Sequence, residues 1–495
     1  MAKSKKTFRP KARAPRGFND RIGAEITAER DMLARISDVY EAHGFDPLET
    51  PALEYTDALG KFLPDVDRPN AGVFSLQDDD DQWMSLRYDL TAPLARYVAE
   101  NYDALPKPFR RFQVGPVWRN EKPGPGRFRQ FTQCDADTVG APAPYADAEM
   151  CALFGDVVSA AGLDKRDFLI RVSNRKIVDG LFEKLGLGGE VHEQTRLTVM
   201  RSMDKFDKFG AGGVAQLLGA GRKDESGDFT EGAGLADAAI ATVTEFLQSG
   251  AGEETDPAAS LSLMADVLGD TKSGAVGLEE LHGIKAAIPD FDNRRIVFDC
   301  AVIRGLEYYT GPVFEAELDF SVKDEKGREV RLGSVGGGGR YDGLVKRFKG
   351  MEVPAVGISV GISRLVSALQ LCDSAARPDG PVVVLALEKD QMASYQAMAA
   401  ELRNAGLRAE VYLGGSNFAK QLKYADKRAA PIAIIQGEDE RGAGDITIKD
   451  LKLGAELSKK IEDNAEWREA QPAQFSVNRS ELVEAVKKTL ARKAP

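Results

Sequence analysis

Residues 110–137, RRFQVGPVWRNEKPGPGRFRQFTQCDAD, constrain the fold of this chain more than any other stretch. A strand-like segment ends at residues 118–121, and a loop rich in glycine and proline, residues 122–126, turns the chain back. Two strands joined by so short a loop pair antiparallel, because a parallel crossover needs about a dozen residues or more. The sequence therefore predicts an α+β fold built on an antiparallel sheet rather than a doubly wound parallel one.

The returning strand of this hairpin carries a polar face. Alternation with a period of two places six side chains on one side: Arg127, Arg129, Phe131, Gln133, Asp135 and Asp137. Burying such a set is costly unless a charged ligand completes it. Arginine suits phosphate because its planar fork binds two oxygens, and a phenyl ring offers a flat surface for a base. The pattern favours a nucleotide site, and the alternative is a solvated face with surface ion pairs.

Further elements follow from periodicity. Residues 24–43 predict a helix that Gly44 ends, and the proline-containing segment 45–53 belongs at a sheet edge or an interface. Residues 92–101 predict a helix, and residues 190–290 read as a helical insertion with one helix near 235–247. The predicted strands are 83–88, 109–118, 130–138, 295–303, 313–320 and 329–336.

The C-terminal part has a different order of predicted elements. After a linker at residues 377–380, strands at 382–387, 409–412 and 432–436 alternate with helices at 391–404 and 417–428. This βαβαβ order predicts a small α/β domain with a parallel sheet.

Composition narrows the class of protein. A chain of 495 residues is long enough for two or three domains, and no apolar run approaches the ~20 residues that span a bilayer. The four cysteines form no C-x-x-C pair and the three histidines are scattered, so neither a disulfide framework nor a zinc site is indicated. We expect a cytoplasmic protein without a fixed metal site and without a membrane contact.

The net charge of −11 argues mildly against nucleic-acid binding, but it is unevenly spread. Residues 380–495 hold 18 basic and 17 acidic residues, whereas the remainder holds 48 and 60. Residues 1–16 carry seven Lys or Arg and no acid. Such a run is typical of a disordered tail, and contact with RNA or a transit peptide are the alternatives.

Three other segments carry chemistry-bearing residues. In residues 301–316, AVIRGLEYYTGPVFEA, Arg304 follows an apolar strand, and Tyr308 and Tyr309 offer hydroxyl groups and flat rings to a ligand. The alternative is a strand corner with a packed tyrosine pair. The glycine run in residues 333–343, GSVGGGGRYDG, tolerates unusual backbone angles and close approach. Residues 357–365, GISVGISRL, lead into a helix with Arg364, which is either a ligand or a solvated arginine. No P-loop motif occurs.

Together these segments resemble the class II aminoacyl-tRNA synthetases, and within them the histidine family. The W-R-N-E hairpin resembles the second class motif, residues 357–365 the third, and residues 40–51 the dimer-forming first. The signature of the histidine family is RGLEYYTG at residues 304–311, and LRYDLTAP at 86–93 and FTQCDAD at 131–137 agree. KQLKYADK at 420–427 resembles the family's anticodon-binding domain.

The resemblance implies a reaction and its site. Histidine and ATP would form histidyl-adenylate, and the 3′ end of tRNA-His would then take the histidine. The residues implied for histidine are Asp89, Thr91, Arg119, Gln133, Asp137, Arg304, Tyr308 and Tyr309. Arg119 and Arg304 would act catalytically at the α-phosphate. The residues implied for ATP are Arg119, Glu121, Arg127, Phe131 and Arg364, with Mg²⁺ carried on the outer phosphates.

The same resemblance implies the organisation of the chain. A basic tail at residues 1–16 would precede a class II catalytic core at 17–376, into which the helical module at about 190–290 is inserted. The linker would be residues 377–380, and residues 381–495 would form an anticodon-binding α/β domain with a mixed sheet. The expected partners are tRNA-His, L-histidine, ATP and a second copy of the chain.

The chain departs from the family pattern in two places. Asp89 and Asp137 stand where many members carry the longer glutamate. The hairpin loop, residues 122–126, is short and offers only Lys122 as a charged side chain, so we expect weak dependence on any acceptor base that this loop contacts.

Three alternative functions remain at the level of sequence. A non-catalytic, synthetase-like regulatory subunit of ATP phosphoribosyltransferase would lack both the Arg-Gly-x-x-Tyr-Tyr element and the C-terminal domain. A synthetase for glycine, threonine or proline would not need Arg304 with Tyr308 and Tyr309. An RNA-binding scaffold would not catalyse histidine-dependent exchange of pyrophosphate into ATP.

Overall fold

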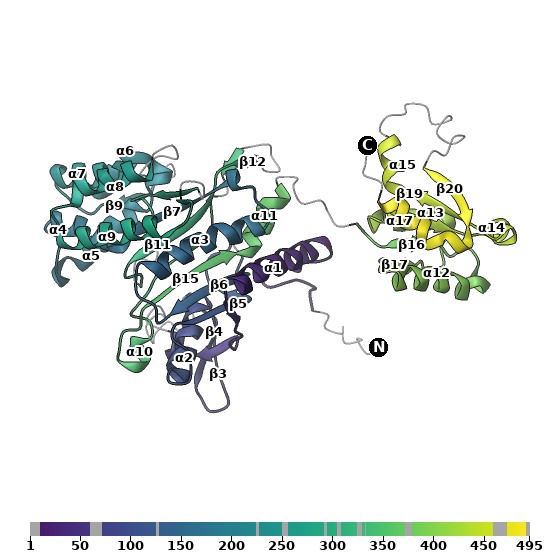
Figure 1. The fold of residues 1–495 in the computed structure, drawn as a ribbon, viewed down its shortest axis with the longest axis horizontal. Coiled ribbons are helices and arrows are strands. Elements are labelled where there is room, and N and C mark those ends of the chain that lie inside the picture. The colour runs from purple at the N-terminus through teal and green to yellow at the C-terminus, as the bar shows by residue number, and fades with distance from the viewer. Residues whose placement is uncertain are drawn as a thin grey trace, which may run out of the picture. The chain divides into compact units, whose positions relative to one another are not determined.

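The computed structural model describes residues 10–59, 72–124, 128–223, 227–249, 256–291, 295–303, 308–323, 329–331, 333–371, 379–458 and 473–491. The chain forms two compact units, residues 1–376 and 377–495, and each is described by itself (Figure 1).

An eight-stranded sheet forms the centre of the first unit. Its strands are β1 (Asp46–Pro47), β5 (Phe109–Trp118), β6 (Gln130–Val139), β7 (Phe168–Asn174), β10 (Ile296–Phe298), β11 (Pro312–Leu318), β14 (Ser334–Arg340) and β15 (Ala355–Gly361). Their spatial order is β1-β5-β6-β15-β14-β11-β7-β10. The inner pairs are antiparallel and the two edge pairs are parallel, which confirms the predicted antiparallel class. β1, which contains Pro47, lies at the edge of the sheet. This agrees with the prediction, because proline has no backbone N–H to donate to a neighbouring strand.

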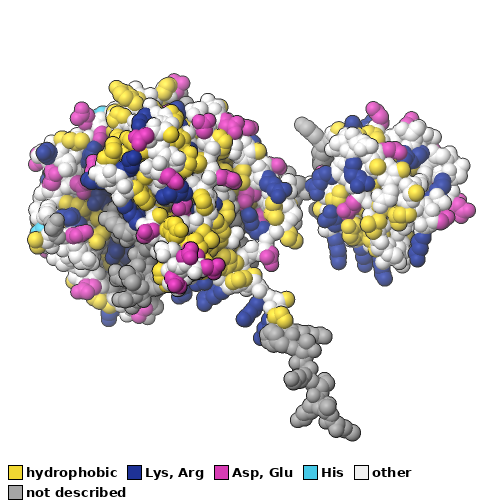
Figure 2. Space-filling view, turned by 90° about the horizontal axis from the view of Figure 1, so that it is seen from below, with side chains coloured by type: hydrophobic (Ala, Val, Ile, Leu, Met, Phe, Trp, Pro, Cys, Tyr) yellow, Lys and Arg dark blue, Asp and Glu magenta, His cyan; other side chains and the backbone are white. Residues whose placement is uncertain are grey.

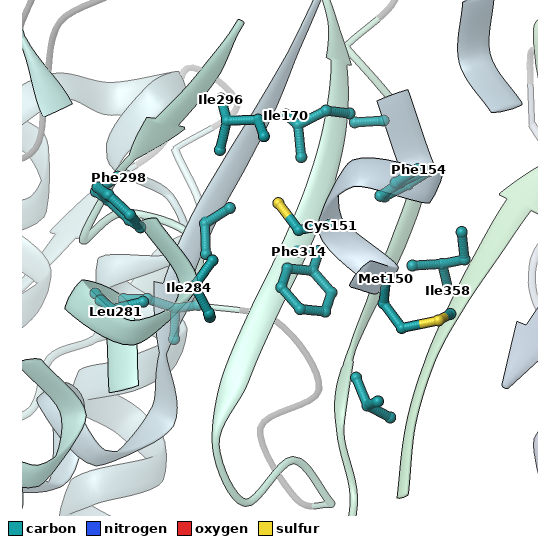
Figure 3. Packing of buried hydrophobic residues seen from close by; sticks show 14 of the residues in the cluster. Met150, Cys151, Phe154, Ile170, Leu281, Ile284, Ile296, Phe298, Phe314 and Ile358 are labelled. Carbon is teal, nitrogen blue, oxygen red and sulfur yellow. The ribbon is translucent and has the colours of Figure 1, made fainter. Parts of the chain in front are cut away.

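Long helices cover one face of this sheet (Figure 1). They are α1 (Ala24–Ala42), α3 (Tyr145–Ala160) and α11 (Ile362–Leu371). Gly44, with φ 76°, ends the predicted N-terminal helix. Figure 3 shows Met150, Cys151 and Phe154 of α3 beside Phe314 and Ile358 of the sheet, all of them buried. Since Cys134 and Ala136 of β6 belong to this core, the odd-numbered residues of β6 lie on the opposite face.

Short elements border that opposite face. They are β2 (Leu53–Tyr55), η1 (Thr56–Leu59), β3 (Ser75–Gln77), β4 (Trp83–Leu86), α2 (Thr91–Asn101) and α10 (Lys346–Lys349). β2, β4 and β3 pair antiparallel, and α2 packs near α10 through a separate cluster that includes Leu94, Val98 and Tyr341.

Residues 175–287 are mainly helical. They form α4 (Arg175–Lys184), α5 (Glu193–Met203), α6 (Phe206–Leu218), α7 (Asp237–Ser249), α8 (Pro257–Leu268) and α9 (Lys272–Ala287), with a hairpin of β8 (Gly221–Lys223) and β9 (Phe229–Glu231). The single strand predicted at 329–336 is wrong. β13 (Glu329–Arg331) pairs with β12 (Ser321–Lys323), and β14 begins after Gly333, whose φ of 64° breaks the strand.

The second unit contains a mixed five-stranded sheet. Its elements are β16 (Val382–Val384), α12 (Met392–Asn404), β17 (Ala409–Val411), α13 (Phe418–Lys427), β18 (Ile432–Ile435), α14 (Glu438–Ala443), β19 (Asp445–Asp450), α15 (Leu451–Ser458), β20 (Gln474–Asn478) and α17 (Leu482–Leu490). The βαβαβ pattern predicted the parallel strands β17-β16-β18 correctly. The periodicity missed β19, which pairs antiparallel with β18, and β20, which pairs antiparallel with β19. The mixed sheet that the family resemblance implied is therefore confirmed.

Candidate active site

A pocket of about 850 Å³ opens in the first unit, beside α2 and α10. Residues from distant parts of the chain line it. Five residues that the sequence singled out are among them: Asp89, Thr91, Arg119, Glu121 and Tyr308. The fold therefore brings together side chains that lie more than 200 positions apart.

Opposite charges line this pocket, because Asp89 and Arg119 are both part of its wall. Asp89 precedes α2, and its Oδ1 accepts the Ala92 N–H at 2.9 Å, so the helix N-terminus holds the carboxylate. Burial raises the pKa of Asp89, while the Ala92 N–H and Arg119 oppose that rise. Arg119 follows β5. Its Nε donates to the Tyr88 carbonyl at 3.1 Å, and its guanidinium carbon lies 5.0 Å from the centre of the Phe131 ring. The backbone bond and the ring together orient Arg119.

A row of buried polar side chains lies on β6, on the same sheet face as Arg111 of β5. Asp137 is 2% exposed and Arg111 is 0% exposed, and their Oδ2 and Nη2 are 2.6 Å apart. The Tyr341 hydroxyl donates to Asp137 Oδ1. Gln133, farther along the row, donates to Ser359 Oγ at 2.6 Å. Arg111 and Tyr341 were not predicted as site residues. The sequence could have indicated Arg111, because alternation along β5 places it on the sheet face that carries Asp137.

Glycines, which have no side chain, leave room for this row. A Cβ at Gly357 would lie 1.9 Å from Asp137 Oδ1, and a Cβ at Gly339 would lie 2.9 Å from Cδ1 of Tyr309. On the core face, a Cβ at Gly336 would lie 2.9 Å from the Phe154 ring. The predicted close approach of the glycine run is confirmed. These glycines have extended β14 geometry without positive φ, so close approach and not backbone angle explains them.

Two tyrosines connect the pocket to the buried row. The ring centroids of Tyr308 and Tyr309 are 4.3 Å apart. Tyr308 lines the pocket, and burial raises its pKa, with Asp89 and Asp135 adding to the rise. Burial also raises the pKa of Tyr309, and Asp137 and Asp135 contribute. Both hydroxyls therefore stay protonated at neutral pH as hydrogen-bond donors.

The structure leaves some predicted residues apart from the pocket. Arg364, in the first turn of α11, donates to the Ser334 carbonyl at 2.6 Å and is not among the residues that line it. Arg129 precedes β6, and its Nε donates to the Glu121 carbonyl at 2.9 Å. Arg127 and Arg304, with most of the basic tail, lie outside the described residues.

The pocket also holds two cations that were not predicted. Lys346 and Arg347 of α10 line it, and Arg347 donates to the Asp57 carbonyl. The signal was the KRFK cluster that follows the glycine run and GRYDG. With Arg119, these cations make part of the pocket wall suited to an anion.

No group of three or more His, Cys, Asp or Glu in the described ranges is arranged to hold a metal ion. No helix within those ranges is long and apolar enough to span a membrane.

The sequence matches two family models. The model described as histidyl-tRNA synthetase matches residues 17–365, and the model described as anticodon binding domain matches residues 381–489. Two histidine–tRNA ligases are similar along their whole length. The chain is 56% identical to that of Rhizobium meliloti (strain 1021), over 99% of this chain and 98% of the relative. It is 55% identical to that of Brucella ovis (strain ATCC 25840 / 63/290 / NCTC 10512), over 99% and 98%.

Solved structures show the same architecture. The histidyl-tRNA synthetase from Nostoc sp. PCC 7120 superposes with a TM-score of 0.72 at 28% identity, covering 97% of this chain and all of that one. An ATP phosphoribosyltransferase regulatory subunit/histidyl-tRNA synthetase from Bacillus halodurans C superposes with a TM-score of 0.64 at 21% identity, covering 84% of this chain and 97% of that one, which supports the fold alone.

Proposed function

The chain belongs to the histidyl-tRNA synthetase family, and we propose how its residues carry out that family's reaction, the ATP-dependent ligation of histidine to tRNA-His. The ligase activity rests on full-length relatives with that activity at more than half identity. The regulatory-subunit reading is not favoured, because the chain matches these ligases from end to end and carries the C-terminal domain.

One observation supports the proposed roles. The Asp89 carboxylate and the Arg119 guanidinium line the same pocket, and Tyr308 connects that pocket to the buried polar row on β6. Asp89 and Thr91 are suited to bind the histidine ammonium group, because both line the pocket and both offer acceptor oxygens. The N-terminus of α2 holds the Asp89 carboxylate in place. Arg119 is suited to the histidine carboxylate and the α-phosphate. The other residues proposed for histidine are Gln133, Asp137, Arg304, Tyr308 and Tyr309.

The first step needs charge neutralisation more than a protein nucleophile. A carboxylate oxygen of histidine attacks the α-phosphorus, the bond to the β-phosphate oxygen breaks, and pyrophosphate leaves. Arg119 and Arg304 stabilise the negative charge that builds at the α-phosphate. Phe131, against which Arg119 lies, and Glu121 are proposed for adenine, and Arg127 and Arg364 for the outer phosphates.

Magnesium fits this scheme as a companion of ATP. The described residues provide no metal-binding cluster, whereas the phosphate oxygens of ATP are hard ligands that Mg²⁺ prefers. Bound there, the ion would neutralise charge on the leaving pyrophosphate. Asp89 and Glu121 are the carboxylates among the residues that line the pocket, and both already have proposed roles with the ammonium group and with adenine.

The second step needs the tRNA. Its terminal ribose hydroxyl attacks the adenylate carbonyl, and AMP leaves. We propose that residues 17–376 form the catalytic core with the insertion at about 190–290, and that residues 381–495 bind the anticodon. The anticodon-domain match supports this, as do the Lys and Arg side chains that project along one border of the C-terminal unit in Figure 2.

Two further features are proposed from the family alone. The protein would work as a homodimer in the cytoplasm. Sedimentation of the purified chain would test the dimer, and a monomer at assay concentration would contradict it.

Pyrophosphate exchange with each amino acid in turn tests the function. We expect histidine alone to support exchange. Arg119→Ala and Arg304→Ala should lower the rate by ~10²–10³ if each stabilises the transition state. Arg408→Ala in the C-terminal unit is the matched control and should leave exchange unchanged. Exchange with another amino acid, or none with histidine, would overturn the proposal.

A further inference from the structure

The short helix α10 brings two cations to the pocket that the scheme above does not use. Lys346 and Arg347 line the pocket beside Phe348, whose side chain is 37% exposed. Lys346 pairs with Glu352 at 2.9 Å, but both side chains are more than half exposed, so the pair is weak and a multivalent anion can displace Glu352. Arg347 pairs with no carboxylate of the described residues. It donates to the Asp57 carbonyl and keeps further N–H donors for a ligand.

Arg347 is a neighbour of the proposed reaction centre. Burial raises the pKa of Tyr88, Asp89 adds to the rise, and both Arg347 and Arg119 oppose it. The position of Tyr88 is fixed at two points, because its hydroxyl donates to the Leu59 carbonyl at 2.8 Å and its own carbonyl accepts from Arg119. Two guanidinium groups therefore act on one fixed tyrosine, and an anion held by Arg347 lies close to the group held by Arg119.

The second reaction step brings a further polyanion to this pocket. The terminal ribose hydroxyl of the tRNA must reach the adenylate carbonyl beside Arg119, so the last nucleotides enter together with their phosphates. The hairpin loop at residues 122–126 offers only Lys122 as a charged side chain. Among the described residues that line the pocket, the cations are Arg119, Lys346 and Arg347. Since Arg119 is assigned to the α-phosphate, the two cations of α10 remain for the tRNA.

The pocket wall beside these cations is largely apolar. Figure 1 shows α10 next to α2, and residues of both helices and of η1 form this wall. Its apolar side chains include Leu59, Ala92, Ala95, Leu344 and Phe348. Every base has a flat face that stacks on an aromatic ring, whatever its sequence. Cations beside an exposed ring are therefore suited to a single-stranded nucleic acid, held through its phosphates and one stacked base.

We propose that Lys346 and Arg347 bind backbone phosphates of the single-stranded 3′ end of the tRNA and that Phe348 stacks on one of its bases. This rests on the proposed function and names residues that position the tRNA for the second step. Helix α10 thereby supplies phosphate contacts that the hairpin loop, with its single lysine, provides sparsely. Neither kind of contact reads a base sequence.

The double change Lys346→Ala with Arg347→Ala tests the proposal in the full-length protein. The Kd for tRNA, measured by fluorescence anisotropy at low salt, should rise at least about tenfold through the lost charge-assisted bonds. The slope of log Kd against log salt concentration should fall by about 0.7 for each lost phosphate contact. A structural role alone would not lower this slope. In pyrophosphate exchange, which needs no tRNA, kcat and the KM values for histidine and ATP should stay within about threefold.

Phe348→Ala tests the stacking part. Transfer of histidine from preformed adenylate to tRNA, measured in a single turnover, should slow about tenfold because one base loses its platform. The salt slope should not change, since the ring carries no charge. An unchanged transfer rate would overturn the stacking contact.

Lys165→Ala, at an exposed position of η2 (Lys165–Asp167), is the matched control and should equal the wild type in every assay. Lys346→Gln with Arg347→Gln, which keeps longer side chains, covers the case in which the alanine variant does not fold. An unchanged tRNA affinity or salt slope would overturn the inference. A raised KM for ATP in exchange would assign α10 to the outer phosphates of ATP and overturn it too. Wild-type exchange with histidine would still uphold the proposed function in these cases, and its absence would overturn both.

Discussion

At the scale of single residues, the absence of side chains shapes the site as much as their presence. Gly357 stands directly opposite Asp137 on β15, and the Asp137 carboxylate occupies the space that a Cβ would need. Tyr309 occupies the corresponding space over Gly339. Glycine at these positions is therefore required by contact with the side chains of Asp137 and Tyr309 and not by backbone angles.

Gly357→Ala tests this requirement. The added methyl should push Asp137 from Arg111 and Tyr341, raise the KM for histidine at least tenfold, and lower the unfolding free energy by about 1–3 kcal/mol. Exchange kinetics and thermal melting measure the two effects. Gly188→Ala, at a position with nothing within 4 Å of the new Cβ, is the control. A variant with wild-type histidine KM would show that the carboxylate is not held there.

Asp135 also predicts a pH effect on stability. Burial raises its folded pKa to about 7, while an unfolded aspartate titrates near 3.9. The raised value favours folding when the group is protonated, and that contribution is lost as pH rises towards and through 7. Asp135→Asn does not titrate. The difference in Tm, variant minus wild type, should therefore increase between pH 5 and pH 8 without ligand. A difference that is constant across this range would contradict the buried, titrating carboxylate.

At the scale of elements, a buried ion pair fixes β14 to α3. Arg340 ends β14, directly before Tyr341, and donates to both oxygens of Asp147 at 2.9 and 2.7 Å. Both side chains are almost fully buried. Arg340 also donates to the Ala141 carbonyl at 3.1 Å. The pair holds the strand end that supplies Tyr341 to the buried row.

Asp147→Ala should therefore cost about 3–5 kcal/mol of unfolding free energy, because the buried Arg340 guanidinium loses its buried bidentate partner and keeps only the half-buried Asp342 carboxylate. Denaturant unfolding would measure the loss. Glu100→Ala removes an exposed i,i+4 partner of Arg96 and should cost less than about 0.5 kcal/mol. Equal, small losses for both variants would show that the buried pair does not fix the strand.

At the scale of the whole molecule, the described site belongs entirely to the first unit. The residues that line the pocket fall between Ala58 and Phe348, and the second unit has its own core around Val384, Leu402 and Ile434. The proposed site of adenylate formation and the proposed anticodon-binding domain would therefore lie in units with separate cores.

Ending the chain after residue 376 tests this separation. The shortened protein should keep histidine-dependent pyrophosphate exchange within about threefold, because its pocket is complete, whereas tRNA charging should fall by at least tenfold through lost phosphate contacts. Charging assays at two salt concentrations would compare both proteins. Full charging by the shortened protein would contradict the role proposed for residues 381–495.

The sequence alone determined the local elements and the family. Alternation along residues 130–138 and the short loop before it gave β5 and β6, because period and loop length are local properties. Asp89, Arg119 and Tyr308 were named from motifs, and the structure places them on one pocket. Their roles, like those of Arg127, Arg304 and Arg364, remain predictions.

Tertiary structure decided which of these polar side chains are engaged. Arg111 and Tyr341 are about 230 positions apart, and no local pattern shows that both meet Asp137. The break at Gly333 was likewise missed, and the antiparallel strands of the C-terminal sheet were implied by the family resemblance and not by periodicity. Strand pairing and burial depend on contacts between distant segments, which the periodicity of a single segment does not encode.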